Sequence, residues 1–167
     1  MKILVTGAAG FIGYHTCLSL LKKKNIKIFE KDNINNYYDT KIKLQRKKML
    51  KKKKNFYFKK IDITNFKPLK NYLTKKKINY IIHLAAQAGV RHSLKKPRDY
   101  IDTNLIGFFN ILEISKIINV KHLVFASTSS VYGLNENFPF KENRIADHPI
   151  QLYAATKKSN EVMAHSY

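Results

Sequence analysis

Two side chains near the end of the sequence are spaced so that they could act together in proton transfer. Tyr153 and Lys157 stand four residues apart in the stretch LYAATKK, a spacing that places both on one face of a helix. A lysine ammonium beside a phenol favours the phenolate and lowers the phenol pKa from its ordinary value of about 10. A tyrosinate near the working pH can act as a general base. The spacing alone also fits an ordinary surface pair.

A run of hydroxyl side chains, FASTSSVYG, follows an apolar stretch at residues 121–127 that predicts a strand. In a doubly wound parallel sheet, ligands bind beyond the carboxyl ends of the strands. Thr128 is therefore expected near the nicotinamide end of a bound dinucleotide. Together with Tyr153 and Lys157, it forms the candidate catalytic set.

A glycine-rich loop, TGAAGFIG, lies between the first predicted strand and the first predicted helix. Gly7 can make the tight turn, Gly10 lets a pyrophosphate approach the backbone at a helix N-terminus, and Gly13 lets helix and strand pack closely. This pattern, at the opening of a strand–helix–strand unit, predicts a dinucleotide site.

Two acidic residues at predicted strand ends would complete that site. Asp32 lies 19 residues after Gly13, where a carboxylate accepts a hydrogen bond from the ribose 2′-hydroxyl of NAD. Asp62 could hold the adenine edge, or it could be a solvated turn residue. We predict NAD as the cofactor, although Glu30 and Lys31 beside Asp32 make the choice against NADP less sharp.

The elements that must position these residues alternate between strand and helix. Because the strands are apolar throughout, they predict a parallel sheet covered on both faces. We predict an α/β Rossmann-type doubly wound sheet that ends after its fifth strand and the start of the next helix, in one NAD-binding domain over residues 1–167. The predicted strands cover residues 2–6, 26–30, 55–62, 79–86 and 121–127. The predicted helices cover residues 11–24, 37–54 (with a basic outer face), 66–77 and 98–120, with Tyr153 early in a last helix.

Composition limits the class of protein. The chain has 167 residues, of which 44% are hydrophobic and 26% charged, as in a folded globular domain. The single cysteine, Cys17, excludes an internal disulfide. No apolar run approaches the ~20 residues that span a bilayer, and the start MKILVTGAAG lacks the features of a signal peptide. We therefore predict a cytoplasmic location, with neither a membrane partner nor a metal site.

The formal net charge of +21 has two interpretations. Basic residues clustered with aromatic ones would indicate nucleic-acid binding. Only four of the cations are arginines, however, and the lysines gather at helix ends and in the run KKMLKKKKN. We interpret them as solvated surface with a general attraction for anionic ligands, and predict no nucleic-acid partner.

The motifs TGAAGFIG, HLAA, STSSVYG and YAATK resemble those of the extended short-chain dehydrogenase/reductase family, in the same order and at the same spacing. Within this family, the longer stretches of residues 32–39, 83–113 and 147–167 are most similar to the UDP-glucuronate 4-epimerases. The resemblance covers the whole chain.

The resemblance implies a mechanism. Tyr153 as phenolate would remove the proton of the sugar 4-hydroxyl while C4 gives hydride to NAD, and the 4-keto sugar would turn before hydride returns to its other face. Lys157 would lower the phenol pKa and bind the nicotinamide ribose, while Thr128 would bond the 4-oxygen. The substrate would be a UDP-hexuronate.

The resemblance also implies which residues line the site. Gln87 and Arg91 should lie close to the sugar and diphosphate, whereas His92 replaces a more usual tyrosine and His83 should pack under the glycine loop. The NAD site should be lined by the three glycines, Tyr153, Lys157, Phe11, Ile12, Asp32, Asn33, Asp62, Ile63, Leu84, Ala85, Ala86 and Asn104.

Ser129 and Ser130 bear on the reaction. The similar 4,6-dehydratases carry an Asp-Glu pair here and the similar decarboxylases carry Glu at the second position. Serine hydroxyls cannot supply that acid–base chemistry, but they can bind a substrate carboxylate, which favours epimerisation.

The resemblance further implies a longer protein with a C-terminal substrate domain, a homodimer at full length. On this interpretation the present chain is an incomplete NAD-binding part that is inactive alone. The alternatives are another NAD-dependent nucleotide-sugar dehydratase or decarboxylase, and a non-catalytic NAD-binding fragment.

Overall fold

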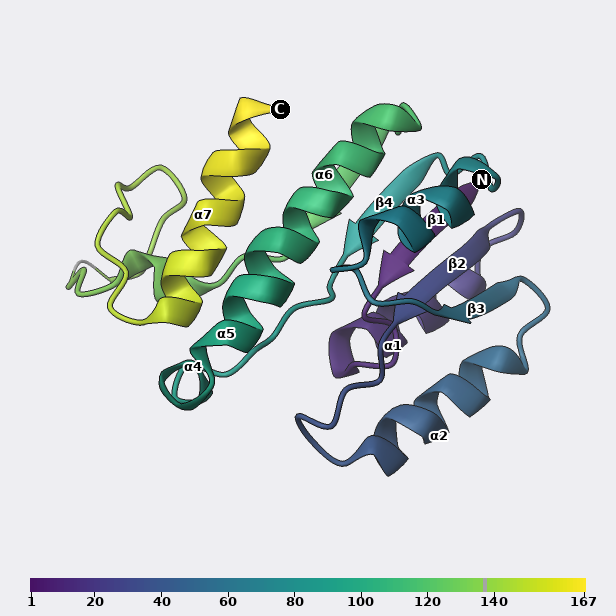
Figure 1. Ribbon diagram of the computed structural model, residues 1–167, viewed down its shortest axis with the longest axis horizontal. Coiled ribbons are helices and arrows are strands. Elements are labelled where there is room, and N and C mark those ends of the chain that lie inside the picture. Colours follow the sequence, from purple (N-terminus) through teal and green to yellow (C-terminus); the bar gives the residue numbers. More distant parts are fainter. Residues whose placement is uncertain (137) are drawn as a thin grey trace.

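The centre of the protein is one parallel sheet of five strands, seen in a computed structural model that describes residues 1–136 and 138–167. The strand order is β3-β2-β1-β4-β5 (Figure 1). The order reverses beside β1, and at such a switch point a crevice opens beyond the strand ends. This arrangement confirms the predicted Rossmann-type α/β fold. The strands are β1 (Lys2–Thr6), β2 (Lys27–Asp32), β3 (Phe56–Lys60), β4 (Tyr80–His83) and β5 (His122–Phe125).

Helices cover both faces of the sheet (Figure 1). Successive residues of a strand point to opposite faces. Leu4 of β1 packs in the core beneath α3 and α6, while Ile3 and Val5 pack in the core beneath α1 and α2. The helices are α1 (Phe11–Leu21), α2 (Thr40–Lys51), α3 (Phe66–Thr74), α4 (His92–Lys95), α5 (Pro97–Tyr100), α6 (Gly107–Ile117) and α7 (Leu152–Ser166).

The predicted helix at residues 98–120 is interrupted in the structure. A π-helical segment, η1 (Ile101–Ile106), joins α5 to α6, and the run ends at Ile117. A 3.6-residue apolar period does not reveal such a segment, because the wider turn is set by tertiary contacts. Two further elements, α4 and the 3₁₀ turn η2 (Ser129–Tyr132), were not predicted.

Glu30 and Lys31, consecutive residues of β2, are both buried, on opposite faces of the sheet. Neither carboxylate oxygen of Glu30 has a hydrogen bond of good geometry to any described residue. Burial, assisted by the charge of Asp32, raises the pKa of Glu30 to about 9. Burial lowers the pKa of Lys31 to about 7, and its ammonium lies 3.6 Å from the ring centre of Tyr72. The fold therefore favours the neutral form of both side chains, and this opposes folding near neutral pH, where the unfolded chain carries both charges.

We predict that Glu30→Gln stabilises the protein more at pH 8 than at pH 5. The folded-state pKa of Glu30 is raised from 4.5 to about 9. The unfolded chain therefore loses this proton at a lower pH than the folded one, and stability falls as pH rises through that interval. Removing the titration should add about 1–3 kcal/mol to the free energy of unfolding at pH 8 relative to pH 5.

Urea unfolding at both pH values measures this difference. The charge of Glu30 raises the pKa of Lys31 in part, so the measured difference reports on Glu30 together with its effect on Lys31. Glu142→Gln, at an exposed carboxylate, is the control and should give the same small change at each pH. An equal effect of Glu30→Gln at pH 5 and pH 8 would show that Glu30 does not titrate in this range.

Candidate active site

A cleft of about 490 Å³ opens at the carboxyl ends of the strands. Its walls come from the loop between β1 and α1, the ends of β2 and β4, and the first turns of α2. Twelve residues that sequence reasoning assigned to the cofactor or substrate lie in this lining: Gly7, Gly10, Phe11, Ile12, Gly13, Asp32, Asn33, Ile63, Leu84, Ala85, Ala86 and Gln87.

The three glycines of the loop have different roles. Gly7 has a φ of +74°, and a Cβ there would lie 2.8 Å from the backbone nitrogen of Ala85. A Cβ on Gly13 would lie 2.3 Å from the carbonyl oxygen of Gly7. A Cβ on Gly10 would meet only that same oxygen, at 3.1 Å. The fold itself thus requires Gly7 and Gly13, whereas Gly10 leaves space on the cleft side.

Gly10 is also the N-cap of α1, and no side chain caps this helix end. The first N–H groups of a helix have no partner within the helix, and together with the helix dipole they favour an anion. The start of α1 therefore presents backbone donors to the cleft, at the place where the sequence predicts a pyrophosphate.

The two predicted acidic residues each organise the backbone around them. Asp32 accepts hydrogen bonds from the amides of Ile34 (2.7 Å) and Ala9 (3.2 Å), and so ties β2 to the glycine loop. Asp62 lies in a hollow beside the cleft that Asn33 also lines. Burial raises the pKa of Asp62, but hydrogen bonds from Asn33 and Thr64 outweigh burial, and the pKa is lowered.

The first turns of α2 contribute a wall that sequence reasoning missed. We expected a basic outer face on this helix, but Lys43 is only 6% exposed and lines the cleft. Its ammonium donates to the backbone and side-chain oxygens of Asn35, at 2.9 and 2.5 Å. Burial lowers the pKa of Lys43, and the charge of Asp32 raises it in part. Arg46, one turn on, donates to the Tyr38 hydroxyl at 3.2 Å.

These residues gave only a weak signal in the sequence. Lys43 and Arg46 have helical spacing, and the amides and phenols of residues 33–38 precede them, but a lysine-rich helix is typical of solvated surface. The lining residues that were not predicted are Lys31, Asn35, Tyr37, Tyr38, Ile42, Lys43, Arg46, Ile61, Ala88, Thr103 and Ala126.

Thr128 and Tyr153 meet in the structure, as the sequence led us to expect. Burial raises the pKa of the Tyr153 phenol, and a hydrogen bond with the Thr128 hydroxyl lowers it in part, which leaves the pKa raised. Thr128 also accepts from the Ser130 amide at 3.2 Å and so caps the 3₁₀ turn η2. Thr128 lies two residues after Ala126, which lines the cleft.

Lys157 is buried on the same helix face as Tyr153. Burial lowers the pKa of Lys157 to about 8, although Glu161 raises it in part. The sequence had led us to expect a lysine charge that lowers the phenol pKa. The structure corrects this expectation, because desolvation acts against the charged form of both groups.

His83 packs beneath the glycine loop, as predicted. The hydroxyl of Thr6 accepts from the amides of Leu84 and Ala85, both at 3.1 Å, and lies 2.8 Å from Nδ1 of His83. Because this hydroxyl already accepts two hydrogen bonds, its proton goes to Nδ1, which leaves the His83 proton on Nε2. Burial and the charge of Lys157 lower the pKa of His83 to about 3, so it stays neutral.

Other predicted site residues lie apart from the cleft. Asn104, expected to contact the cofactor, is 2% exposed and both amide hydrogens are used within the protein. Its side chain accepts from the amide of Gln87 at 2.8 Å and donates to the Gln87 carbonyl at 3.0 Å, which holds that backbone in place. Arg91 lines a separate hollow with Tyr37, and Ser129 is exposed.

Within residues 1–136 and 138–167, no three His, Cys, Asp or Glu side chains are grouped so as to hold a metal ion. None of the helices in this part of the chain combines the length and apolar character needed to cross a bilayer.

Comparison with known proteins gives consistent similarities. The model of the GDP-mannose 4,6 dehydratase family matches residues 4–167. Protein CapI of Staphylococcus aureus is 48% identical, and a probable UDP-glucuronate 4-epimerase of Rhizobium meliloti is 46% identical. Each match covers 100% of this chain and 49% of the relative. A solved UDP-glucuronic acid 4-epimerase of Bacillus cereus, in complex with UDP-glucuronic acid and NAD, is 36% identical. It has a TM-score of 0.92, over 100% of this chain and 52% of that one. The chain thus spans about half the length of these proteins.

We predict that Gly13→Ala destabilises the protein more than Gly10→Ala does. The new methyl group at position 13 would overlap the Gly7 carbonyl, which belongs to a packed turn and cannot move away. Overpacking of this kind costs about 1–3 kcal/mol of unfolding free energy, or more. Gly10→Ala should change it by less than about 1 kcal/mol. Urea unfolding of both variants checks this order, and a larger loss at position 10 would contradict the loop geometry.

Proposed function

Because the chain belongs to the GDP-mannose 4,6 dehydratase family, we propose that it contributes the NAD-binding half of a nucleotide-sugar 4-epimerase that interconverts UDP-glucuronate and UDP-galacturonate. The observation that carries this proposal is the hydrogen bond between Thr128 and Tyr153, with Lys157 on the same face of α7, beyond a cleft of dinucleotide type that Ala126 lines. The relative from Rhizobium meliloti and the solved enzyme of Bacillus cereus support the choice of substrate.

The residues of the cleft fit NAD. The open side of Gly10 and the uncapped start of α1 would receive the pyrophosphate, and a Cβ at Gly10 would narrow that space. Asp32 still has lone pairs for a ribose hydroxyl. When bound, oxidised NAD would supply a hydride acceptor and a positively charged ring.

Tyr153 is the proposed base, and it needs a nearby positive charge. Its phenol pKa is raised in this structure, so the phenolate must be stabilised before the sugar hydroxyl can lose a proton. Lys157 has a pKa of about 8 and is cationic below that pH. Thr128, bonded to the phenol, can pass a proton between the sugar oxygen and Tyr153. Turnover is therefore expected to lose this support as Lys157 deprotonates above about pH 8.

Dehydration is a second candidate reaction, because the matching family model carries the name of a dehydratase. Elimination of water would require an additional acid and base beside C5 and C6 of the sugar. The residues that follow Thr128 are Ser129 and Ser130, which offer hydroxyls and no carboxylate. This favours epimerisation, in which Tyr153 and Thr128 suffice for the proton.

We predict that NAD binds at least about tenfold more tightly than NADP. The carboxylate of Asp32 would face the 2′-phosphate of NADP with like charge. Asp32→Asn should narrow the difference, and Asp99→Asn, at an exposed acid, is the control that should leave it unchanged. Calorimetric titration with both dinucleotides decides the matter. Equal or tighter binding of NADP by the parent would show that Lys31, Lys43 and Arg46 outweigh Asp32.

We predict that Tyr153→Phe leaves NAD affinity nearly intact and lowers turnover by about 10²–10⁴-fold, since general-base catalysis contributes that much. The assay follows the anomeric proton of UDP-glucuronate by NMR. It uses the protein expressed from the open reading frame that contains this sequence. Tyr57→Phe, on the outer side of β3, is the matched control and should retain full turnover.

The products discriminate among the candidate functions. A 4-keto-6-deoxy product would indicate a dehydratase, and a pentose product would indicate a decarboxylase. Conversion of UDP-glucose alone would show that the carboxylate is not recognised. NAD binding without turnover of any nucleotide sugar would identify a non-catalytic binding protein.

A further inference from the structure

We propose that Asn160 is a positioning residue, which sets the depth of Tyr153 and Lys157 in the active site by fixing α7 against the π-helical segment η1. The inference rests on the proposed function, since it assigns these two side chains to the reaction.

Asn160 makes one buried contact that links the two helical segments. Its side chain is 1% exposed, and Nδ2 donates to the carbonyl oxygen of Asn104 at 2.7 Å. Asn104 in turn donates from its own side chain to the Thr156 hydroxyl on α7, at 3.1 Å. Two polar links, one in each direction, thus join η1 to adjacent turns of α7.

The contact of Asn160 affects Tyr153 and Lys157 because all three residues lie on one face of α7. Tyr153, Thr156, Lys157 and Asn160 follow one another at helical spacing and share one face. A helix moves nearly as a rigid body over two turns. Any slide or rotation of α7 that broke the Asn160 contact would therefore also displace Tyr153 and Lys157.

An amide suits this position because a hydrogen bond depends on direction. Apolar contacts between two helices are non-directional and tolerate a small slide. A buried amide that loses its partner is left desolvated and unpaired, so the bond between Asn160 and Asn104 disfavours other registers. η1 packs against α7 (Figure 1), and the carbonyl of Asn104 lies in its interior.

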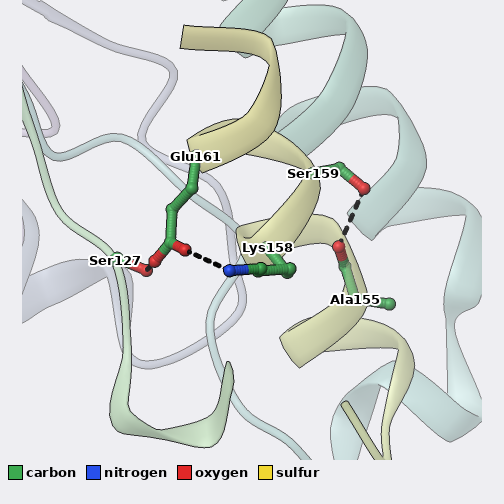
Figure 2. Close-up of polar contacts among 5 residues, drawn as sticks. All are labelled: Ser127, Ala155, Lys158, Ser159 and Glu161. Atoms are coloured by element: carbon green, nitrogen blue, oxygen red, sulfur yellow. Dashed lines mark hydrogen bonds and ion pairs between the residues drawn. The ribbon is translucent and has the colours of Figure 1, made fainter. Parts of the chain in front are cut away.

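A second link holds α7 on its other side, through the next residue. Glu161 accepts from the Ser127 hydroxyl, one residue before Thr128, and from the Lys158 ammonium at 3.2 Å (Figure 2). This link is partly exposed, with 32% of the Glu161 side chain accessible, so solvent weakens it. The buried bond of Asn160 is the more selective of the two.

The pKa of Lys157 can be used to detect a shift of α7. Burial holds its pKa at about 8, below the ordinary 10.5. Glu161 from its own helix raises this pKa in part, and the neighbouring His83 of β4, whose own pKa is lowered to about 3, is neutral across the range of interest. If α7 shifts, water reaches Lys157 and its pKa should move towards the ordinary value.

The test is competitive acetylation of lysines with acetic anhydride between pH 6 and 11, with each site quantified by mass spectrometry. In the parent, Lys157 should titrate near 8. In Asn160→Ala its pKa should rise by about one unit or more, while the acetylation of the partly exposed neighbour Lys158, which pairs with Glu161, should remain as in the parent. Ser159→Ala is the matched control, because the Ser159 hydroxyl donates within α7, to the Ala155 carbonyl at 2.9 Å (Figure 2).

Asn160→Asp provides a second, reversible variant. A buried carboxyl group has a raised pKa, and its protonated form can donate to the Asn104 carbonyl as the amide does. Hydrogen exchange of the η1 amides should therefore match the parent at low pH and match Asn160→Ala at high pH. This variant also serves if Asn160→Ala does not fold, since it can be studied at low pH.

The outcomes separate this inference from the proposed function. The acetylation measurement does not depend on turnover. If Asn160→Ala raises the Lys157 pKa in a protein that epimerises no sugar, the positioning role is supported and the proposed function is wrong. An unchanged Lys157 pKa in folded Asn160→Ala, or an Asn160→Asp variant that behaves alike at every pH, overturns the positioning role. Where turnover is present, Asn160→Ala should lower kcat about tenfold, and Ser159→Ala should not.

Discussion

The close approach of β1, α1 and β4 at the glycine loop is the constraint on which the rest of the structure depends. Gly13 packs against the carbonyl of Gly7, and Gly7 in turn lies against the backbone of Ala85. The Thr6 hydroxyl accepts the amides of Leu84 and Ala85 at 3.1 Å, which fixes the end of β4 beside β1. Because of these contacts, the start of α1 faces the same cleft as the end of β4.

Carbonyl oxygens and aromatic rings help to stabilise the buried lysines of this protein. Lys31 and Lys43 donate to carbonyl oxygens, and Lys31 also lies over the ring of Tyr72. With 32 basic and 11 acidic residues, carboxylate partners are too few to pair with every cation. Backbone oxygens and aromatic rings contact the buried cations instead. Lys43 of α2 is held in this way where it lines the cleft.

Burial disfavours the charged forms of Tyr153 and Lys157, the titratable members of the candidate catalytic set, and of the neighbouring His83. The pKa of Tyr153 is raised, while those of Lys157 and His83 are lowered to about 8 and about 3. Such a site keeps its phenol protonated unless positive charge stabilises the phenolate. On the proposed function, Lys157 below about pH 8 and the bound oxidised dinucleotide would together supply that charge, so that proton removal would be favoured in an occupied cofactor site.

The sequence by itself determined the fold class, the glycine loop and the approximate place of each strand, and it selected Thr128, Tyr153 and Lys157 as catalytic candidates, because these follow from local spacing and apolar runs. Only the tertiary structure decided the burial of Glu30 and Lys43, the π-helical segment around Asn104, and the direction of the Tyr153 pKa shift. A lysine in a basic helix looks the same in sequence whether it faces water or a cleft. Burial and pKa depend on desolvation by residues far away in the chain, and no local pattern records those contacts.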